Sequence, residues 1–311
     1  MRLLLIGCTG FVGRKLVSQL LSNGHHLTLI SRKTEKEFPL ITTSENLVRL
    51  QLNPANPKSW EQSPLKTALK NSEGIINLAG EPIAEQRWTP THCLEIQNSR
   101  LATTKALVNA MAELRRPPRV LVNASAIGYY GTSPDATFNE QSPCGNDFLS
   151  KLCQKWEAEA IKKPKSTRLI IFRIGIVLGP DGGALGKMLP IFKAGLGGPI
   201  GSGEQWMSWV HRTDLSEMIQ QALTNKQWSG VVNAVAPQPV SMNNFAASLG
   251  KSLGRPSLLS VPGPILKLLL GDGARVVLEG QKVESRRLKN LGFQFKYLEL
   301  NQALNEITKG T

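Results

Sequence analysis

Three glycines near the start of the chain have a spacing that suits phosphate binding. Gly7, Gly10 and Gly13 follow apolar residues at 3–6 and precede a segment with the apolar period of an amphipathic helix. In such a unit the first glycine allows a tight turn, the second admits a pyrophosphate, and the third lets the helix pack on the strand. Phosphate oxygens are attracted to the helix N-terminus. We predict a dinucleotide-binding loop, the alternative being that the glycines only punctuate the start of a helix.

The residues after the second predicted strand bear on the choice of cofactor. The strand at 26–30 is followed by Ser31, Arg32 and Lys33, and the next acidic residue is Glu35. An acidic side chain at this point would bond the free 2′-hydroxyl of NAD, whereas an arginine suits the 2′-phosphate of NADP. We therefore predict NADP as the cofactor. The alternative is that both basic residues are ordinary solvated charges.

A second set of residues has side chains that suit substrate binding. Arg87 and Trp88 follow the fourth predicted strand, while Trp206, Trp209 and His211 follow a glycine-rich stretch. An arginine could pair with a carboxylate or phosphate, and a tryptophan could stack on a ring. The alternative is that the later tryptophans and the histidine belong to a core between two lobes.

The cysteines give no sign of metal or disulfide chemistry. Cys8, Cys93, Cys144 and Cys153 form no Cys-x-x-Cys pair and no metal-ligand spacing with the histidines. We expect reduced thiols and no metal.

Composition narrows the classes of partner. The net charge is +14, but the lysines and arginines are scattered, so we expect an anionic cofactor and substrate, not a nucleic acid. No stretch approaches the roughly 18 apolar residues of a membrane span, and we expect no membrane partner. The chain starts with a strand pattern, not with a targeting segment, so we expect a cytoplasmic protein.

Elements that would position these residues alternate along the first part of the chain. A long helical pattern covers about 90–111, a shorter helix starts near Asp214, and Ser241 is a candidate N-cap. The alternation predicts an α/β fold, a Rossmann-type doubly wound parallel sheet, with ligands beyond the carboxyl ends of the strands. We expect an NADP-binding domain at 1–184, with later segments returning to the sheet, and a smaller substrate-binding lobe at 185–311. The predicted strands are 3–6, 26–30, 47–52, 74–80, 119–126 and 168–179.

Ordered sequence blocks over nearly the whole chain resemble the extended short-chain dehydrogenase/reductase superfamily. They include GCTGFVG, NLAGEPI, GYYG, RIGIVLGPDGGAL and a C-terminal LEGQKVESRRLKNLGFQFKY. Within the superfamily, the chain resembles the atypical epimerase-like group labelled SulA-like cell division inhibitors. The resemblance implies a Rossmann fold and a nicotinamide cofactor. The residues that it places at the cofactor are Thr9, Gly10, Phe11, Val12, Ser31, Arg32, Leu78, Ala79, Glu95, Arg100 and Val177. Gly7, Gly13, Lys33 and Gly80 complete the predicted cofactor site.

Two of these assignments have structural alternatives. Arg100 could instead pair with Glu95 on the surface of the long helix, and Val177 could be an ordinary core residue.

The superfamily's Tyr-x-x-x-Lys pair, in which the lysine tunes the tyrosine as an acid or base, is missing. None of Tyr129, Tyr130 and Tyr297 has a lysine four residues later. Lys151 matches the lysine of the family pattern, but Asp147 stands four residues before it.

The remaining acid–base candidates are Tyr129, with Ser125 and Lys151 in support. Ser125 lies one place from the serine of related proteins, and Ala126 occupies that place. The alternative is that Tyr129 only packs.

Two hypotheses follow. The first is an NADP(H)-dependent oxidoreductase or epimerase-like enzyme that acts on an anionic small molecule. The second is a non-catalytic regulatory protein that binds NADP(H) and signals to a protein partner; the label of the similar group suggests a link to cell division. The missing Tyr-x-x-x-Lys pair favours the second, and the glycine-and-tryptophan stretch favours the first.

Overall fold

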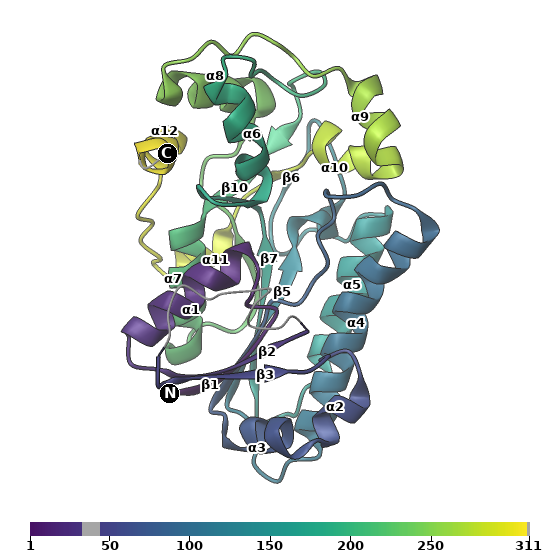
Figure 1. Ribbon diagram of the computed structural model, residues 1–311, viewed down its shortest axis with the longest axis vertical. Helices are drawn as coiled ribbons and strands as arrows, with labels where there is room; N and C mark the ends of the chain where they lie inside the picture. Colours follow the sequence, from purple (N-terminus) through teal and green to yellow (C-terminus); the bar gives the residue numbers. More distant parts are fainter. Residues whose placement is uncertain (33–43, 310–311) are drawn as a thin grey trace.

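The centre of the computed structural model is a seven-stranded sheet, and every strand pair in it is parallel. The structure describes residues 1–32 and 44–309. The strand order is β11-β7-β5-β4-β1-β2-β3, so the winding direction reverses beside β1 (Figure 1). This confirms the predicted doubly wound Rossmann-type fold. The strands are β1 (Arg2–Ile6), β2 (His26–Ser31), β3 (Leu47–Gln51), β4 (Gly74–Asn77), β5 (Val120–Ala126), β7 (Arg168–Ile174) and β11 (Gly230–Ala234).

Helices cover both faces of this sheet. Leu3 and Leu5 of β1 point to one face, where they join the core formed with α1 and α7. Leu4 and Ile6 point to the other face, where they pack with Leu107 of α4 and its neighbours. Because alternate residues of a strand face opposite sides, a strand covered on both sides must be apolar throughout, as β1 is. The covering helices are α1 (Phe11–Ser22) and α7 (Arg212–Thr224) on one face, and α2 (Pro57–Glu61), α3 (Ser63–Asn71), α4 (Pro90–Ala112) and α5 (Phe148–Ile161) on the other.

A smaller lobe lies beyond one end of the sheet (Figure 1). Its core contains Phe192, Trp209, Phe245 and Leu304. Its helices are α6 (Gly183–Lys193), α8 (Met242–Leu253), α9 (Gly263–Leu270), η2 (Gly271–Ala274), α10 (Arg275–Leu278) and α12 (Leu300–Lys309). The remaining elements are η1 (Ile127–Tyr130), β6 (Thr137–Phe138) with β13 (Lys282–Val283), β8 (Ile176–Leu178) with β10 (Trp209–His211), β9 (Trp206–Met207) with β12 (Val240–Ser241), and α11 (Arg286–Asn290), which packs on β11.

The prediction of a single sixth strand is wrong. Residues 168–179 form two strands, β7 in the large sheet and β8 in a separate pair with β10. Gly175 separates them, and a Cβ on it would lie 2.5 Å from the backbone oxygen of Ser208. The chain must therefore pass close to the segment before β10, which turns it out of the large sheet.

Helix starts agree with the capping residues. The hydroxyl of Ser241 accepts a hydrogen bond from the Asn244 N–H at 3.2 Å, which confirms it as the N-cap of α8. The helix predicted near Asp214 begins at Arg212, and His211 caps it.

The two lobes interleave in sequence. α7 and β11 both follow residue 184, yet they belong to the sheet and its covering layer. Segments after 184 therefore return to the sheet, and the functional division at 184 and 185 stays a prediction. In the part of the chain that the structure describes, no helix is long and apolar enough to cross a membrane.

Candidate cofactor and substrate site

The glycine loop between β1 and α1 is shaped by close backbone packing at two of its three glycines. Gly7 has φ +71°, and a Cβ on it would lie 2.4 Å from the backbone nitrogen of Ala79. A Cβ on Gly13 would lie 2.3 Å from the backbone of Cys8. By contrast, the nearest atom to a Cβ on Gly10 is the Gly7 oxygen at 3.8 Å. Protein packing therefore requires the outer glycines, whereas the middle one borders space that a phosphate could occupy.

Gly10 is also the N-cap of α1. It provides no side-chain cap, and the first turn of the helix contains no acidic residue. The N–H groups of this turn therefore suit an anionic ligand. Within the loop, Thr9 is half-buried, and burial of Cys8 raises its pKa to about 12, so this thiol stays neutral.

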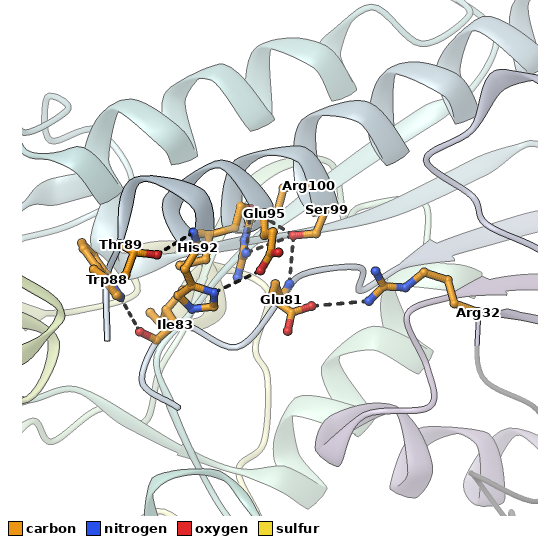
Figure 2. A network of polar contacts seen from close by, with 10 residues as sticks. Arg32, Glu81, Ile83, Trp88, Thr89, His92, Glu95, Ser99 and Arg100 are labelled. Carbon is orange, nitrogen blue, oxygen red and sulfur yellow. Dashed lines mark hydrogen bonds and ion pairs between the residues drawn. The ribbon is translucent and has the colours of Figure 1, made fainter. Parts of the chain in front are cut away.

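A polar network links the end of β2 to the helix α4 (Figure 2). The guanidinium of Arg32 lies 3.4 Å from a carboxylate oxygen of Glu81. The Glu81 N–H donates to the hydroxyl of Ser99 at 2.9 Å, and Arg100 donates to the Ile96 carbonyl at 3.1 Å. Arg32 is 63% exposed, so its guanidinium is accessible to a phosphate. Ser31 is half-buried beside it, and Lys33 lies outside the described residues.

The loop after β4 brings this network against the glycine loop. Leu78 donates its N–H to Ile6 at 2.8 Å, and Ala79 is buried. A Cβ on Gly80 would lie 2.9 Å from the guanidinium of Arg100, so this glycine lets the arginine approach the loop closely. Burial lowers the pKa of Arg100, and its guanidinium lies 5.3 Å from the centre of the Trp156 ring. The Glu95 carboxylate instead contacts Nδ1 of His92 at 3.4 Å (Figure 2).

Residues from the start of α7 and from the loop after β8 close over the glycine loop. The ring of Phe11 packs under the guanidinium of Arg212 at 4.7 Å. Arg212 also pairs with Asp181 at 2.5 Å, and Arg14 of α1 lies 3.7 Å from the same carboxylate. The loop between β8 and α6 is thus held against the start of α1.

A cavity of about 430 Å³ adjoins the glycine loop. Phe11 and Val12 line one end of it, Arg100 lies on its wall, and Val177 lines it from β8. Further lining residues come from the end of β5, from α5, from β9 and the residue after it, and from the segment around α10, and include Ala126, Phe148, Leu152, Cys153, Trp206, Ser208, Arg275, Val276 and Glu279. The wall is largely apolar. A dinucleotide lying over Gly10 could therefore end in a largely apolar space.

The predicted acid–base residues do not line this cavity. Ser125 is buried and donates to Glu157 at 2.7 Å. Tyr129 lies against Arg173, whose guanidinium carbon is 3.3 Å from the ring centre. Lys151 is on the exposed side of α5. The cavity lining therefore gives no support to these three residues, and their part in acid–base chemistry stays a prediction.

The cavity face of α5 instead carries Phe148 and Leu152. Residues four apart lie on the same face of a helix, so these two have the spacing of a Tyr-x-x-x-Lys pair but without its hydroxyl and amine. Ala126 lines the cavity where related proteins keep a serine. Burial raises the pKa of the neighbouring Cys153 thiol to about 12, so it is a poor proton donor near neutral pH.

Two of the predicted substrate residues belong to the core of the molecule. Trp209 is fully buried, and its indole N–H donates to the Gln238 carbonyl at 3.0 Å. His211 is buried and contacts Glu306 at 3.1 Å. Neither side chain reaches the cavity, so the structural alternative is correct for both. These two residues lie on β10, a strand that is covered on both sides. The sequence pattern did not distinguish this buried strand from a loop.

The other three lie at or near the cavity. Trp88 and Trp206 line it, and their indole N–H groups donate to the carbonyls of Ile83 and Pro134, both at 2.7 Å. Arg87 donates to the Leu268 carbonyl at 3.3 Å and does not line the cavity. Their role in substrate binding stays a prediction.

Several residues of the site are not among those predicted. Glu81 directly follows NLAG, so its proximity to the end of β2 could have been expected from the fold. Phe148 and Leu152 could have been found from the helical spacing on α5. Arg275 and Glu279 are paired at 2.9 Å at the cavity wall; Glu279 belongs to the C-terminal block that resembles the family, but nothing in the sequence indicates that this block reaches the cavity.

The comparisons with known proteins agree with this geometry. The profile of the NAD dependent epimerase/dehydratase family matches residues 3–234, and that of a domain of unknown function, DUF1731, matches residues 261–307. The Arabidopsis thaliana protein named epimerase family protein SDR39U1 homolog, chloroplastic, is 45% identical over 308 residues, which cover 97% of this chain and 85% of that protein.

Two solved structures extend the likeness to three dimensions. The crystal structure of human epimerase family protein SDR39U1 with NADPH is 37% identical, covers 100% of both chains and has a TM-score of 0.89. The nucleoside-diphosphate sugar epimerase from Corynebacterium glutamicum is 29% identical, with a TM-score of 0.74 over 98% of this chain and 57% of its own. By its sequence and its doubly wound fold, the chain belongs to the NAD dependent epimerase/dehydratase family, within the extended short-chain dehydrogenase/reductases.

Proposed function

We propose that this chain binds NADP(H) and is an oxidoreductase for a small molecule held in the cavity beside the glycine loop. The observation that best supports this proposal is that the parts of the site adjoin one another. The exposed Arg32, the open space at Gly10 and the cavity lined by Val12 and Val177 follow one another along the carboxyl edge of the sheet. NADPH in the human relative's structure supports the same choice of cofactor.

Each part of the site has a distinct task in this proposal. Arg32 and Ser31 would hold the 2′-phosphate, and the N–H groups at the start of α1 would hold the pyrophosphate. When bound, the cofactor supplies or accepts a hydride. The apolar wall formed by Phe148 and Leu152 excludes water from the reacting groups.

Arg100 determines the class of substrate that fits best. It is a cation on the cavity wall that makes no ion pair with any described acidic residue. Arg275, by contrast, is already paired with Glu279. A substrate with one anionic or strongly polar group and an apolar body would match both Arg100 and the surrounding wall.

Hydride transfer to a carbonyl group and epimerisation both require a proton donor or acceptor beside the reacting carbon, and Phe148, Leu152 and Ala126 carry none. Asp147 and Glu279, which also line the cavity, are the acidic side chains that could exchange this proton. The same apolar face favours the second candidate, an NADP(H)-binding regulatory protein without turnover. A link to cell division and a cytoplasmic location stay predictions, and the name of the Arabidopsis relative places that protein in the chloroplast.

Two glycine variants test cofactor binding. Gly10→Val has room in the free protein, so it should fold normally by circular dichroism and yet lose NADPH binding. Gly13→Val, whose Cβ would overlap the backbone of Cys8, should instead lose stability. Undiminished NADPH binding by a folded Gly10→Val protein would contradict the proposed site.

Titrations with NADPH and NADH test the choice between them. The parent should bind NADPH more tightly, and Arg32→Ala should remove about a tenfold to a hundredfold preference, the value of one charged hydrogen bond. Lys58→Ala, on the exposed start of α2, is the control. Equal affinities in the parent protein would contradict the assignment of NADP.

Turnover separates the two functions. Oxidation of NADPH should be measured with a panel of carbonyl compounds that each carry a carboxylate or phosphate and an apolar body. Turnover that is reduced by Arg100→Gln supports the oxidoreductase. NADPH binding without turnover across the panel would favour the regulatory protein.

A further inference from the structure

The outer end of the smaller lobe exposes large apolar side chains. Leu258 is 85% exposed and Leu268 is 73% exposed. Most of the exposed large apolar residues of the described chain lie on α6, on α9 or on the segments next to them. They are Ile191, Leu196, Leu258, Leu259, Ile265, Leu268 and Leu269.

Backbone hydrogen bonds join these segments into one surface. The Leu259 N–H donates to Gly197 at 3.1 Å, and the Val261 N–H donates to Pro199 at 3.0 Å. The segment between α8 and α9 thus lies against the segment after α6, and it crosses the outer end of the lobe (Figure 1). The apolar residues of the two segments are therefore neighbours on the folded surface.

Helix α9 presents an apolar face with nothing on it. None of its residues is buried. Ile265, Leu268 and Leu269 are spaced three and four residues apart, so they lie on one side of the helix, and all three are more than half exposed. Isolated surface leucines are common, but a contiguous apolar surface of this kind marks a site of interaction.

Basic residues predominate in the two segments that form this end, and the acidic residues Asp181, Glu204 and Asp272 directly flank them. Residues 182–203 and 242–271 contain no aspartate or glutamate. They contain the basic residues Lys187, Lys193, Lys251, Arg255 and Lys267. Lys251, Arg255 and Lys267 are exposed. A partner that covers this end must therefore accept apolar side chains and carry negative charge around them.

We propose that this end of the smaller lobe docks on the surface of an anionic lipid bilayer. Exposed leucines beside lysines and arginines are the pattern of a peripheral membrane surface, in which apolar groups enter the interface and basic groups meet the lipid headgroups. A second copy of the chain fits less well, because a symmetric interface would place the basic residues of both copies together. Docking here requires no membrane span, which is why hydropathy along the sequence gives no sign of it.

The docked surface adjoins the site described above. α9 leads through η2 directly into α10, where Arg275 and Val276 line the cavity. The backbone N–H of Trp88 donates to the Leu270 carbonyl at 3.2 Å, and this bond links the last turn of α9 to the cavity wall. The bilayer would therefore lie beside the cavity and not at the opposite end of the sheet.

Cosedimentation with vesicles of defined composition tests the proposal. The full chain should bind vesicles of phosphatidylcholine with 30% phosphatidylglycerol, and bind pure phosphatidylcholine vesicles at least about tenfold more weakly at low salt. The triple variant Lys251→Gln, Arg255→Gln, Lys267→Gln should weaken binding to the anionic vesicles on the order of a hundredfold. Leu268→Ser with Leu269→Ser should weaken it as well.

Matched variants elsewhere control for charge and hydrophobicity. Lys66→Gln, Lys70→Gln and Arg116→Gln remove the same charge from exposed positions on the opposite part of the molecule, and Val48→Ser with Ile161→Ser removes exposed apolar groups. Both control proteins should bind anionic vesicles as the parent does. NADPH binding or circular dichroism establishes that each variant is folded.

Three outcomes would overturn the proposal. The first is no binding of the parent to anionic vesicles, and the second is equal loss of binding in the control variants. The third is a dimer in sedimentation velocity that Leu268→Ser with Leu269→Ser dissociates, because a second copy would then be the occupant.

Discussion

Tyr129 and Tyr130 are neighbours in sequence but differ in how the fold uses their hydroxyl groups. The Tyr130 hydroxyl donates to Asn233 at 2.6 Å and accepts from Arg173 at 3.0 Å. Arg173 also makes two hydrogen bonds of 2.8 Å to Glu157, and the whole group is buried. Burial raises the pKa of Tyr130 to about 12, so the phenol stays protonated. Tyr129 contributes the face of its ring to Arg173.

Phenylalanine substitutions should therefore have unequal effects. Tyr130→Phe leaves buried polar groups of Asn233 and Arg173 without a partner, and should lower the free energy of unfolding by about 1–3 kcal/mol. Tyr129→Phe keeps the ring on Arg173 and should change stability by less than about 0.5 kcal/mol. Urea denaturation of the two proteins measures the difference. Equal losses would mean that the Tyr129 hydroxyl has a role not visible in this structure.

Glu81 should oppose the proposed cofactor. Its carboxylate pairs with Arg32, and a 2′-phosphate at Arg32 would have to displace or approach that carboxylate. Glu81→Gln should therefore tighten NADPH binding by about threefold to tenfold, since both side chains are partly solvated and screened. NADH, which has no 2′-phosphate, should bind almost as before. Weaker NADPH binding by this variant would indicate that Glu81 positions Arg32 and does not compete for it.

The helix α7 begins with an imidazole that must be neutral. Nδ1 of His211 accepts a hydrogen bond from the Thr213 N–H at 3.1 Å, so it cannot carry a proton, and Nε2 donates to Glu306 at 3.1 Å. Burial lowers the pKa of His211 from 6.5 to about 4, although Glu306 acts in the opposite direction. Arg212 and Lys296 lower it further. The positive end of the helix dipole also disfavours the imidazolium.

The pH dependence of stability should follow from this cap. Below 6.5 the unfolded chain binds a proton at His211 that the folded chain does not, so the free energy of unfolding falls as pH falls toward about 4. His211→Asn keeps an N-cap acceptor but cannot titrate. Between pH 7 and 5 the parent should lose on the order of 2 kcal/mol more than the variant. Parallel stability profiles of the two proteins would refute this role of His211.

The same elements show what the sequence could and could not predict. The sheet, the loop at Gly7 and the cap at Ser241 were predictable because they depend on local patterns: an apolar run, a glycine spacing and a capping hydroxyl. The burial of Trp209 was not, because it depends on segments as distant as α8 and α12 packing on β10. The sequence alone could not show which residues of α5 line the cavity, because this depends on how the helix is oriented against the sheet. That orientation turns Leu152 toward the cavity and Lys151 toward solvent.

The net charge of the whole molecule also favours the binding of anionic ligands. The basic excess is not confined to the cofactor site, since residues such as Lys66 and Lys70 of α3 lie at the end of the sheet opposite the smaller lobe (Figure 1). A net charge of +14 produces a positive potential around the chain that draws anions toward it from any direction. Local contacts at Arg32 then determine which anion is retained.

Salt should separate these two contributions to NADPH binding. The Debye length falls from about 10 Å at 0.1 M salt to about 3 Å at 1 M, so the association rate should fall steeply with added NaCl, more for NADPH than for the less charged NADH. Lys66→Glu with Lys70→Glu changes the net charge by four, from +14 to +10, without touching the site. At low salt this variant should bind NADPH about twofold to fivefold more slowly and dissociate at the parent rate, whereas Arg32→Ala should dissociate faster. Stopped-flow fluorescence measures both rates. If the remote charge reversal left the association rate unchanged at low salt, the attraction of the cofactor would be local to Arg32 and the wider basic surface would have another purpose.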